Sequence, residues 1–341
     1  MAIIPSNTQF RGDTTGVTIV DKGSASTNAR AEYFTMADIA QSTQPTTNNT
    51  VYGLEAFQNN VSSENSIAIG YQAFNGPSTG DYNIALGWQS LQTNTSGSEN
   101  IAIGVNTLRY NTTGNFNVAL GTSSLSLNST GFENVAIGKE ALKLNAGGEG
   151  NTAIGFEALK NSTGNYNTGI GRDALISNTS GNDNTGVGVV ALNNNTTGVQ
   201  NNALGVVAGY GNSTGSNNTS MGHGANYLNA SGSENASFGY RAGVSLTSGS
   251  GNTFVGPYTG EGPSFSGSTS GDNNIVIGKW SDHKNFDESV VIGVGANATA
   301  SNQFVVGSAS YNAGAVTTAS AAQTKTWDVI INGVAEKILL A

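Results

Sequence analysis

Short apolar runs alternate with polar, glycine-rich turns at a nearly constant interval along most of the chain. The unit reads N-x-A-[ILV]-G, then a few residues, then A-L, then a polar N-x-[ST]-G turn. Eleven of the fifteen intervals between the glycines that end the first segment are 17 residues, one is 16, and the last three are 22, 15 and 14. These glycines lie at positions 53, 70, 87, 104, 121, 138, 155, 171, 188, 205, 222, 239, 256, 278, 293 and 307.

Each unit holds two short strand signals, the N-x-A-I segment and a second segment that ends in Ala-Leu or a similar pair, such as Thr107-Leu108. Glycine density and the shortness of the apolar runs disfavour helix. A fixed period of short strands separated by turns is typical of a solenoid, in which each rung buries its apolar face by stacking on its neighbours. The pattern therefore predicts an all-β fold, a repetitive β-roll or β-solenoid rod of about 17-residue rungs.

The two faces of the predicted strand differ. Side chains alternate between faces along a strand, and here Ile, Val, Leu or Thr fill one face while Ala, Gly or Ser fill the other in most repeats. No repeat places a charge at these three positions, and a strand uncharged on both faces is usually covered on both. We expect one face to line the interior of the roll and the small-residue face to meet another chain, so that several chains share an axis. A single-chain solenoid with its Ala face in solvent is the alternative.

An asparagine precedes the apolar segment in most repeats. Stacked at one rung spacing, these amides are expected to form a ladder of side-chain hydrogen bonds, unless each serves only its local turn. The residues are Asn83, Asn100, Asn117, Asn134, Asn151, Asn167, Asn184 and Asn201.

The ends of the chain depart from the repeat and suggest four segments. Residues 1–50 form an attachment or capping segment, with a short strand at 17–20 and a helix candidate at 31–40. Residues 51–256 hold the regular repeats, and 257–307 hold irregular repeats with an inserted loop. Residues 308–341 form a cap or trimerisation segment, in which Asn332-Gly333 between two β-rich runs predicts a hairpin with a type I′ turn.

Composition excludes several classes of function. Charged residues are only 10% of the chain, the net charge is −9 and there is no cysteine. We therefore expect no nucleic-acid partner, because no basic patch is present, and no disulfide or Cys-type metal site. The first residues lack a secretory signal pattern and no apolar run is long enough to cross a membrane, so no membrane insertion is expected.

The rungs also carry a resemblance. Residues 66–70 (S-I-A-I-G) resemble the head repeats of YadA-type trimeric autotransporter adhesins, which form a trimeric left-handed β-roll. The longer N-T-T-G-x-x-N-x-A-I-G rungs and the ending at 326–341 are similar to tail-fibre-like structural proteins of tailed bacteriophages. This resemblance, over residues 51–341, implies a homotrimeric virion fibre that is made in the host cytoplasm without a signal peptide. It further implies that the N-terminal segment docks on other virion proteins, and that a host cell-surface glycan or protein is a possible partner.

Candidate chemistry is sparse, and we expect no enzyme, no cofactor and no metal. The G-x-S-x-G match at 211–215 lies in an ordinary turn, and the only histidines are His223 and His283. The best candidates for ligand contact lie in the irregular region, where charge and aromatics gather: Trp280, His283, Lys284 and Phe286. A solvated loop with one buried Trp is the alternative.

Four functions remain open on the sequence. The first is a virion fibre, tail fibre or similar appendage, that contributes to host recognition. A bacterial surface adhesin or exported filament is the second, and a solenoid depolymerase, which needs paired carboxylates on adjacent rungs, is the third. An ice-binding solenoid, which needs a flat Thr array, is the fourth.

Overall fold

The computed structural model describes residues 8–13, 16–21, 48–261, 269–308, 325–331 and 334–340. Within these ranges every regular element is a β-strand and there is no helix, so none could span a membrane. The strands are β1 Thr8–Asp13, β2 Gly16–Asp21, β3 Thr50–Tyr52, β4 Ile67–Ile69, β5 Ile84–Leu86, β6 Ile101–Ile103, β7 Val118–Leu120, β8 Val135–Ile137, β9 Thr152–Ile154, β10 Thr168–Ile170, β11 Thr185–Val187, β12 Asn202–Leu204, β13 Thr219–Met221, β14 Ala236–Phe238, β15 Thr253–Val255, β16 Ile275–Ile277, β17 Val290–Ile292, β18 Phe304–Val306, β19 Lys325–Ile331 and β20 Val334–Leu340.

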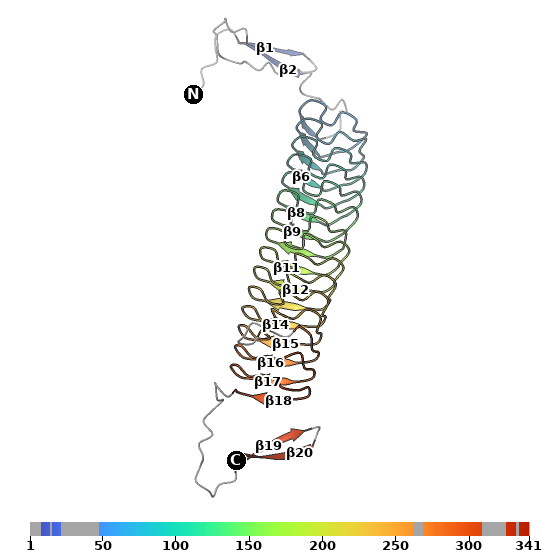
Figure 1. Ribbon diagram of the computed structural model, residues 1–341. Helices are drawn as coiled ribbons and strands as arrows, with labels where there is room; N and C mark the ends of the chain where they lie inside the picture. Colours follow the sequence, from blue (N-terminus) through green and yellow to red (C-terminus); the bar gives the residue numbers. More distant parts are fainter. Residues whose placement is uncertain are drawn as a thin grey trace.

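Strands β3 to β18 form a single 16-stranded parallel sheet whose order follows the sequence. Each strand pairs with the equivalent three residues of the next rung, as Ile101 pairs with Val118 and Ile103 with Leu120. The rungs stack along one axis into a rod (Figure 1). The predicted all-β solenoid with rungs of about 17 residues is therefore confirmed.

The remaining strands form two antiparallel pairs. β1 pairs with β2, which contains the strand predicted at residues 17–20. β19 pairs with β20 in the register expected for a hairpin. The helix candidate at 31–40 and the Asn332-Gly333 turn lie outside the described residues.

The predicted second strand of each rung is wrong. The segment that ends in Ala-Leu is a series of turns, because alternate residues adopt left-handed backbone angles, with φ of 56° at Asn106 and 49° at Leu108. This conformation costs a non-glycine residue about 1 kcal/mol or more and bends the chain too tightly for an extended strand. The bend is held from outside the rung, since Leu108 N donates to Ser124 O at 3.1 Å and Asn106 N to Trp88 O at 2.8 Å.

The glycine that ends each strand is required by both its backbone angle and its neighbour. Gly121 has φ of +123°, and a Cβ added to it would lie 2.7 Å from the carbonyl oxygen of Gly138 in the next rung. The same contact between stacked glycines repeats along the rod. Any side chain at these positions would push neighbouring rungs apart.

Two facing columns of side chains fill the core. In the regular rungs the middle strand residue is Ala, such as Ala102 and Ala119, and the turn supplies a buried Leu, such as Leu108 and Leu125. Toward the C-terminal end the sizes are exchanged. The middle residue becomes Phe254, and Gly243 and Gly260 take the Leu position, where an added Cβ would lie 2.9 and 2.7 Å from the Phe254 ring. The glycines at positions 243 and 260 thereby leave room for the Phe254 ring.

The small-residue face of the strand points inward, which corrects the argument that this face meets another chain. Ala68, Ala85 and Ala102 have no exposed surface because they pack on the Leu column of their own chain. The first and third strand residues point outward and are half-buried or exposed. We call this outward set, the first and third residues of β3 to β18, the outer strip.

The stacked glycines give a direct test of the rung geometry. We expect Gly121→Ala to lower the free energy of unfolding by about 3 kcal/mol or more, through backbone strain and the clash with Gly138. Urea unfolding followed by circular dichroism measures this change.

Gly147→Ala is the matched control. Gly147 does not have a positive φ, and its added Cβ would meet only the Thr130 Oγ1 atom at 3.1 Å, so a change below about 1 kcal/mol is expected. Equal losses in both variants would contradict the stacked-glycine geometry.

Candidate functional surfaces

The eight predicted asparagines form a continuous buried ladder. Asn134 shows the pattern, since its Nδ2 donates to Asn117 Oδ1 at 3.1 Å and to Gly148 O at 2.8 Å. Its Oδ1 accepts from the backbone N and the Nδ2 of Asn151, at 2.9 and 3.1 Å. The same amide-to-amide bond joins every successive pair from Asn83 to Asn201 and continues to Asn218.

A second buried ladder was not predicted. The asparagine of the N-x-[ST]-G turn donates both along the rod and to its own turn, as Asn111 does to Asn94 Oδ1 at 2.8 Å and to Gly114 O at 3.0 Å. Ser162 replaces this asparagine beside the 16-residue interval and accepts from Asn178 instead. The turn motif was visible in the sequence, but nothing in it showed that the asparagine side chain points inward.

A third column of polar side chains lies at the bend before the strand and only accepts hydrogen bonds. Asn165 Oδ1 accepts a hydrogen bond from Glu149 N at 3.0 Å. In an earlier rung, Asp81 Oδ1 accepts a hydrogen bond from Glu64 N at 2.8 Å. Asp287 fills the position near the C-terminal end, accepting from Asp272 N at 2.8 Å. Asn and Asp are interchangeable here because no donor is used.

The ladders predict that replacing Asn by Asp lowers stability strongly at one site and hardly at another. Asn134→Asp removes two buried donors and places a carboxylate beside Asn117 Oδ1 and Gly148 O, so we expect a loss of about 3 kcal/mol of stability. Asn165→Asp, where an aspartate already serves in other rungs, should change stability by less than about 0.5 kcal/mol. Chemical unfolding of both variants at neutral pH provides the comparison. A tolerated Asn134→Asp would show that the ladder contributes little.

Of the four residues predicted to contact a ligand, three are partly accessible, namely Trp280, Lys284 and Phe286, and Trp280 and Lys284 belong to separate contacts. Trp280 is half-buried beneath the ammonium of Lys279, which lies 4.0 Å from the ring centroid, and its ring is 6.3 Å from that of Tyr258. Lys284 Nζ lies 3.0 Å from Asp282 Oδ2. Trp280 thus ends a row of rings that continues through Tyr240 at 5.2 Å from Tyr258.

Phe286 and His283 pack toward the core, and only His283 is fully buried. Phe286 packs against the core of the last rungs, and His283 has no exposed surface. The His283 ring lies 5.6 Å from the ring of Phe254, and neither ring nitrogen has a hydrogen-bond partner. In the folded rung the His283 side chain therefore does not lie at the surface.

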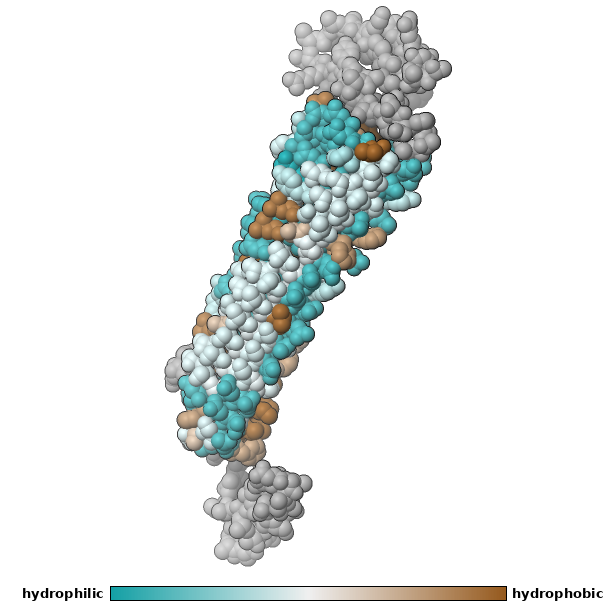
Figure 2. All heavy atoms as spheres, turned by 90° about the vertical axis from the view of Figure 1, so that its right-hand side faces the viewer, coloured by the Kyte–Doolittle hydropathy of each residue, from teal (hydrophilic) through white to brown (hydrophobic). Residues whose placement is uncertain are grey.

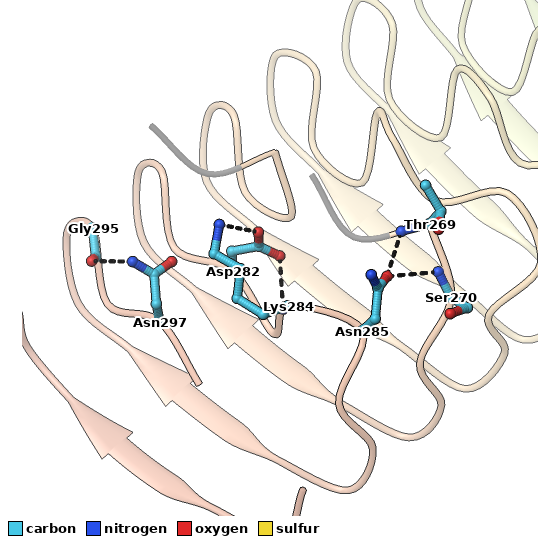
Figure 3. Close-up of polar contacts among 7 residues, drawn as sticks. All are labelled: Thr269, Ser270, Asp282, Lys284, Asn285, Gly295 and Asn297. Atoms are coloured by element: carbon cyan, nitrogen blue, oxygen red, sulfur yellow. Dashed lines mark hydrogen bonds and ion pairs between the residues drawn. The ribbon is translucent and has the colours of Figure 1, made fainter. Parts of the chain in front are cut away.

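Around His283 the polar side chains bind backbone of their own or adjacent rungs. Figure 3 shows Asn285 accepting from the backbone N–H groups of Thr269 and Ser270, at 2.6 and 3.0 Å. It also shows Asp282 accepting from the backbone N–H of Lys284 at 3.2 Å. These contacts keep the irregular rungs in register where the chain departs from the 17-residue period.

Burial lowers the pKa of His283, although the carboxylates of Asp282, Asp287 and Asp272 oppose this and Lys284 adds to it. The folded protein therefore holds a neutral imidazole at a pH where the unfolded chain has already taken up a proton. Below about pH 6.5, the ordinary value for histidine, the unfolded state gains protons that the folded state does not. The free energy of unfolding then falls until the pH drops below the folded pKa.

We expect His283→Leu to remove part of the acid sensitivity of the rod. The melting temperature Tm of the unaltered protein should fall more between pH 8 and pH 5.5 than that of the variant, as measured by circular dichroism. His223→Gln, which alters the exposed histidine, is the comparison variant. Identical profiles for the unaltered protein and His283→Leu would contradict a neutral buried imidazole.

The outer strip, from β3 to β18, carries no charged side chain. The column formed by the third residue of each strand is apolar throughout, with exposed fractions of 37% at Ile69 and 39% at Leu120. In the first-residue column, Ile275 has an exposed fraction of 43%. Polar members are confined to the first-residue column, where Thr168 pairs with both Thr152 and Thr185.

The rod looks different from the side shown in Figure 2. A pale band of near-neutral residues runs along that side between hydrophilic flanks, and hydrophobic residues occur there only in separate patches. Hydrophobic residues therefore do not form a continuous surface on that side of the rod.

Among the described residues, no group of three or more His, Cys, Asp or Glu side chains could hold a metal ion. No protein-family model matches this chain, and no curated protein matches it in sequence. The structure therefore carries the functional argument.

Proposed function

We propose that this protein is a structural fibre that assembles as a homotrimer, of the kind that a tailed bacteriophage displays on its virion as a tail fibre or similar appendage. The observation that carries the proposal is the outer strip. It runs over sixteen strands, about 70 Å at the usual strand spacing, and is about 10 Å wide. Monomers rarely expose a contiguous apolar patch larger than a few hundred Å².

The area of the outer strip suits a protein interface. Length and width give about 700 Å², close to the 800 Å² that each partner contributes to an interface of standard size. A partner must also match the rung spacing over the whole length. A further copy of this chain has the same spacing and the same length, which favours self-association over a globular partner.

The trimeric number of chains rests on the resemblance of the rungs to trimeric β-rolls, since the outer strip by itself supports self-association without fixing the number of chains. Residues 1–50 do not follow the repeat, which supports a role in docking on other virion proteins. A rod that projects from the particle would present its sides and far end to the host, where it contributes to recognition.

The ice-binding alternative has less support. A flat Thr array would serve ice binding, but the run of three paired threonines at β9 to β11 ends at Asn202 in β12. The neighbouring column of the strip is filled by large aliphatic side chains. Such a surface is better matched to another apolar surface.

Self-association is tested by the molar mass in solution. We expect light scattering on a sizing column to give about three times 34.7 kDa for the unaltered chain. The double variant Ile103→Lys and Ile137→Lys places charges in the fourth and sixth strands of the outer strip and should give monomers. Thr113→Lys, which adds a charge on an exposed turn, should keep the mass of the unaltered chain.

A monomeric unaltered protein would overturn the proposal. A dimer would keep the outer strip as an interface and overturn the resemblance to trimeric β-rolls.

A further inference from the structure

An exposed column of side chains follows the bend two residues before each strand, and it alternates between aromatic and acidic residues. Over seven successive rungs it reads Tyr82, Glu99, Phe116, Glu133, Gly150, Tyr166 and Asp183. All six side chains are exposed, with exposed fractions of 59% for Tyr82, 51% for Phe116 and 56% for Tyr166. We call these six side chains the aromatic–acidic ridge.

The ridge side chains share one backbone conformation and therefore one direction. Their φ angles lie between 56° and 58°, from Tyr166 at 56° to Tyr82 and Asp183 at 58°. Left-handed angles are costly for these residue types, and the fold imposes them at every rung. The parallel register then repeats each position at about 4.8 Å along the rod.

The ring of Tyr166 is fixed in position. It lies against Gly150 of the preceding rung, where an added Cβ would come within 2.6 Å of its Cδ1 atom. Its hydroxyl donates to Glu149 Oε1 at 2.5 Å, and this hydrogen bond raises the pKa of Tyr166. Glycine at position 150 leaves room for the ring, so that the ring backs onto the rod while more than half of the side chain stays exposed.

The aromatic rings consequently recur at about every second rung. Tyr82 and Phe116 are two rungs apart, and the Tyr166 ring leans from the third rung after Phe116 toward the second. Two rungs span about 10 Å. Carboxylates of Glu99 and Glu133 occupy the intervening rungs.

We propose that the aromatic–acidic ridge binds an uncharged β-1,4-linked polysaccharide chain that lies along the rod. An extended chain of this linkage turns the same ring face to one side at every second sugar, a repeat close to the length of two rungs. The apolar faces of pyranose rings pack on aromatic rings, and carboxylates accept hydrogen bonds from sugar hydroxyls. Acidic polysaccharides are disfavoured because the ridge carboxylates would repel them.

This inference rests on the proposed function in one respect: it names the class of ligand that a host-recognising fibre would bind. Binding is tested separately from assembly. We expect isothermal titration calorimetry of the full chain to detect cellohexaose or chitohexaose but not polygalacturonate. Tyr166→Ala should weaken binding about tenfold, the size of one well-placed stacking contact. Glu133→Gln should also weaken it.

Tyr110→Ala is the matched control, because Tyr110 is an exposed aromatic outside the ridge with an exposed fraction of 42%. It should leave binding unchanged. Light scattering on every variant shows whether assembly is intact, so a loss of binding with unaltered mass assigns the effect to the ridge.

The inference would be overturned if neither hexasaccharide gave heat, or if Tyr166→Ala bound as tightly as the unaltered chain. It would also be overturned if oligolysine, added as a purely electrostatic probe of the carboxylates, bound and the hexasaccharides did not. A changed mass in Tyr166→Ala would overturn it too, because the ridge would then be a contact between subunits. Glycan binding by a monomeric chain would instead keep this inference and overturn the trimeric fibre.

Discussion

Parallel stacking at one strand spacing is the constraint on which the rest of this structure depends. It brings each residue against its equivalents one rung before and after, so whatever occupies a position must be compatible with a copy of itself at about 4.8 Å. Glycine satisfies this rule at the strand end because it has no Cβ. Asparagine satisfies it in the interior because its amide carries both a donor and an acceptor, and Asn134 uses both toward its neighbours.

The stacking rule also explains where charge occurs. A column of identical charges would repel itself in the low dielectric of the interior, and most interior columns are apolar, amide or hydroxyl. Many charges lie at turns, and opposite signs meet at some of them, as in the contacts of Lys160 with Glu140 at 2.8 Å and with Glu157 at 3.2 Å. The low overall charge is therefore a consequence of repetition, and it leaves the outer strip free of the charges that would oppose association.

The sequence predicted the period, the strand that follows each Asn, and the antiparallel pair at the C-terminal end, because these depend on local pattern and spacing. It misplaced the faces of the strand, since alternation separates Ala102 from Ile101 and Ile103 without showing which side is inside. The second strand failed because a run such as Thr107-Leu108 looks extended, whereas left-handed angles at Asn106 and Leu108 follow from contacts with neighbouring rungs. Composition singled out His283 as a contact residue, but only the packing against Phe254 showed that it is buried.

The packing of Phe254 against glycine in the core differs from the packing of Ala against Leu in the earlier rungs. A rung with Leu in its turn fits beneath a rung with Ala in its strand, but a Leu opposite Phe254 would have no room, since even a Cβ at Gly260 would lie 2.7 Å from the ring. We expect duplication or loss of a whole rung to be tolerated where neighbouring rungs share Ala and Leu, and to be harmful next to Phe254. The length of the rod can therefore vary more readily in its Ala and Leu rungs than beside Phe254.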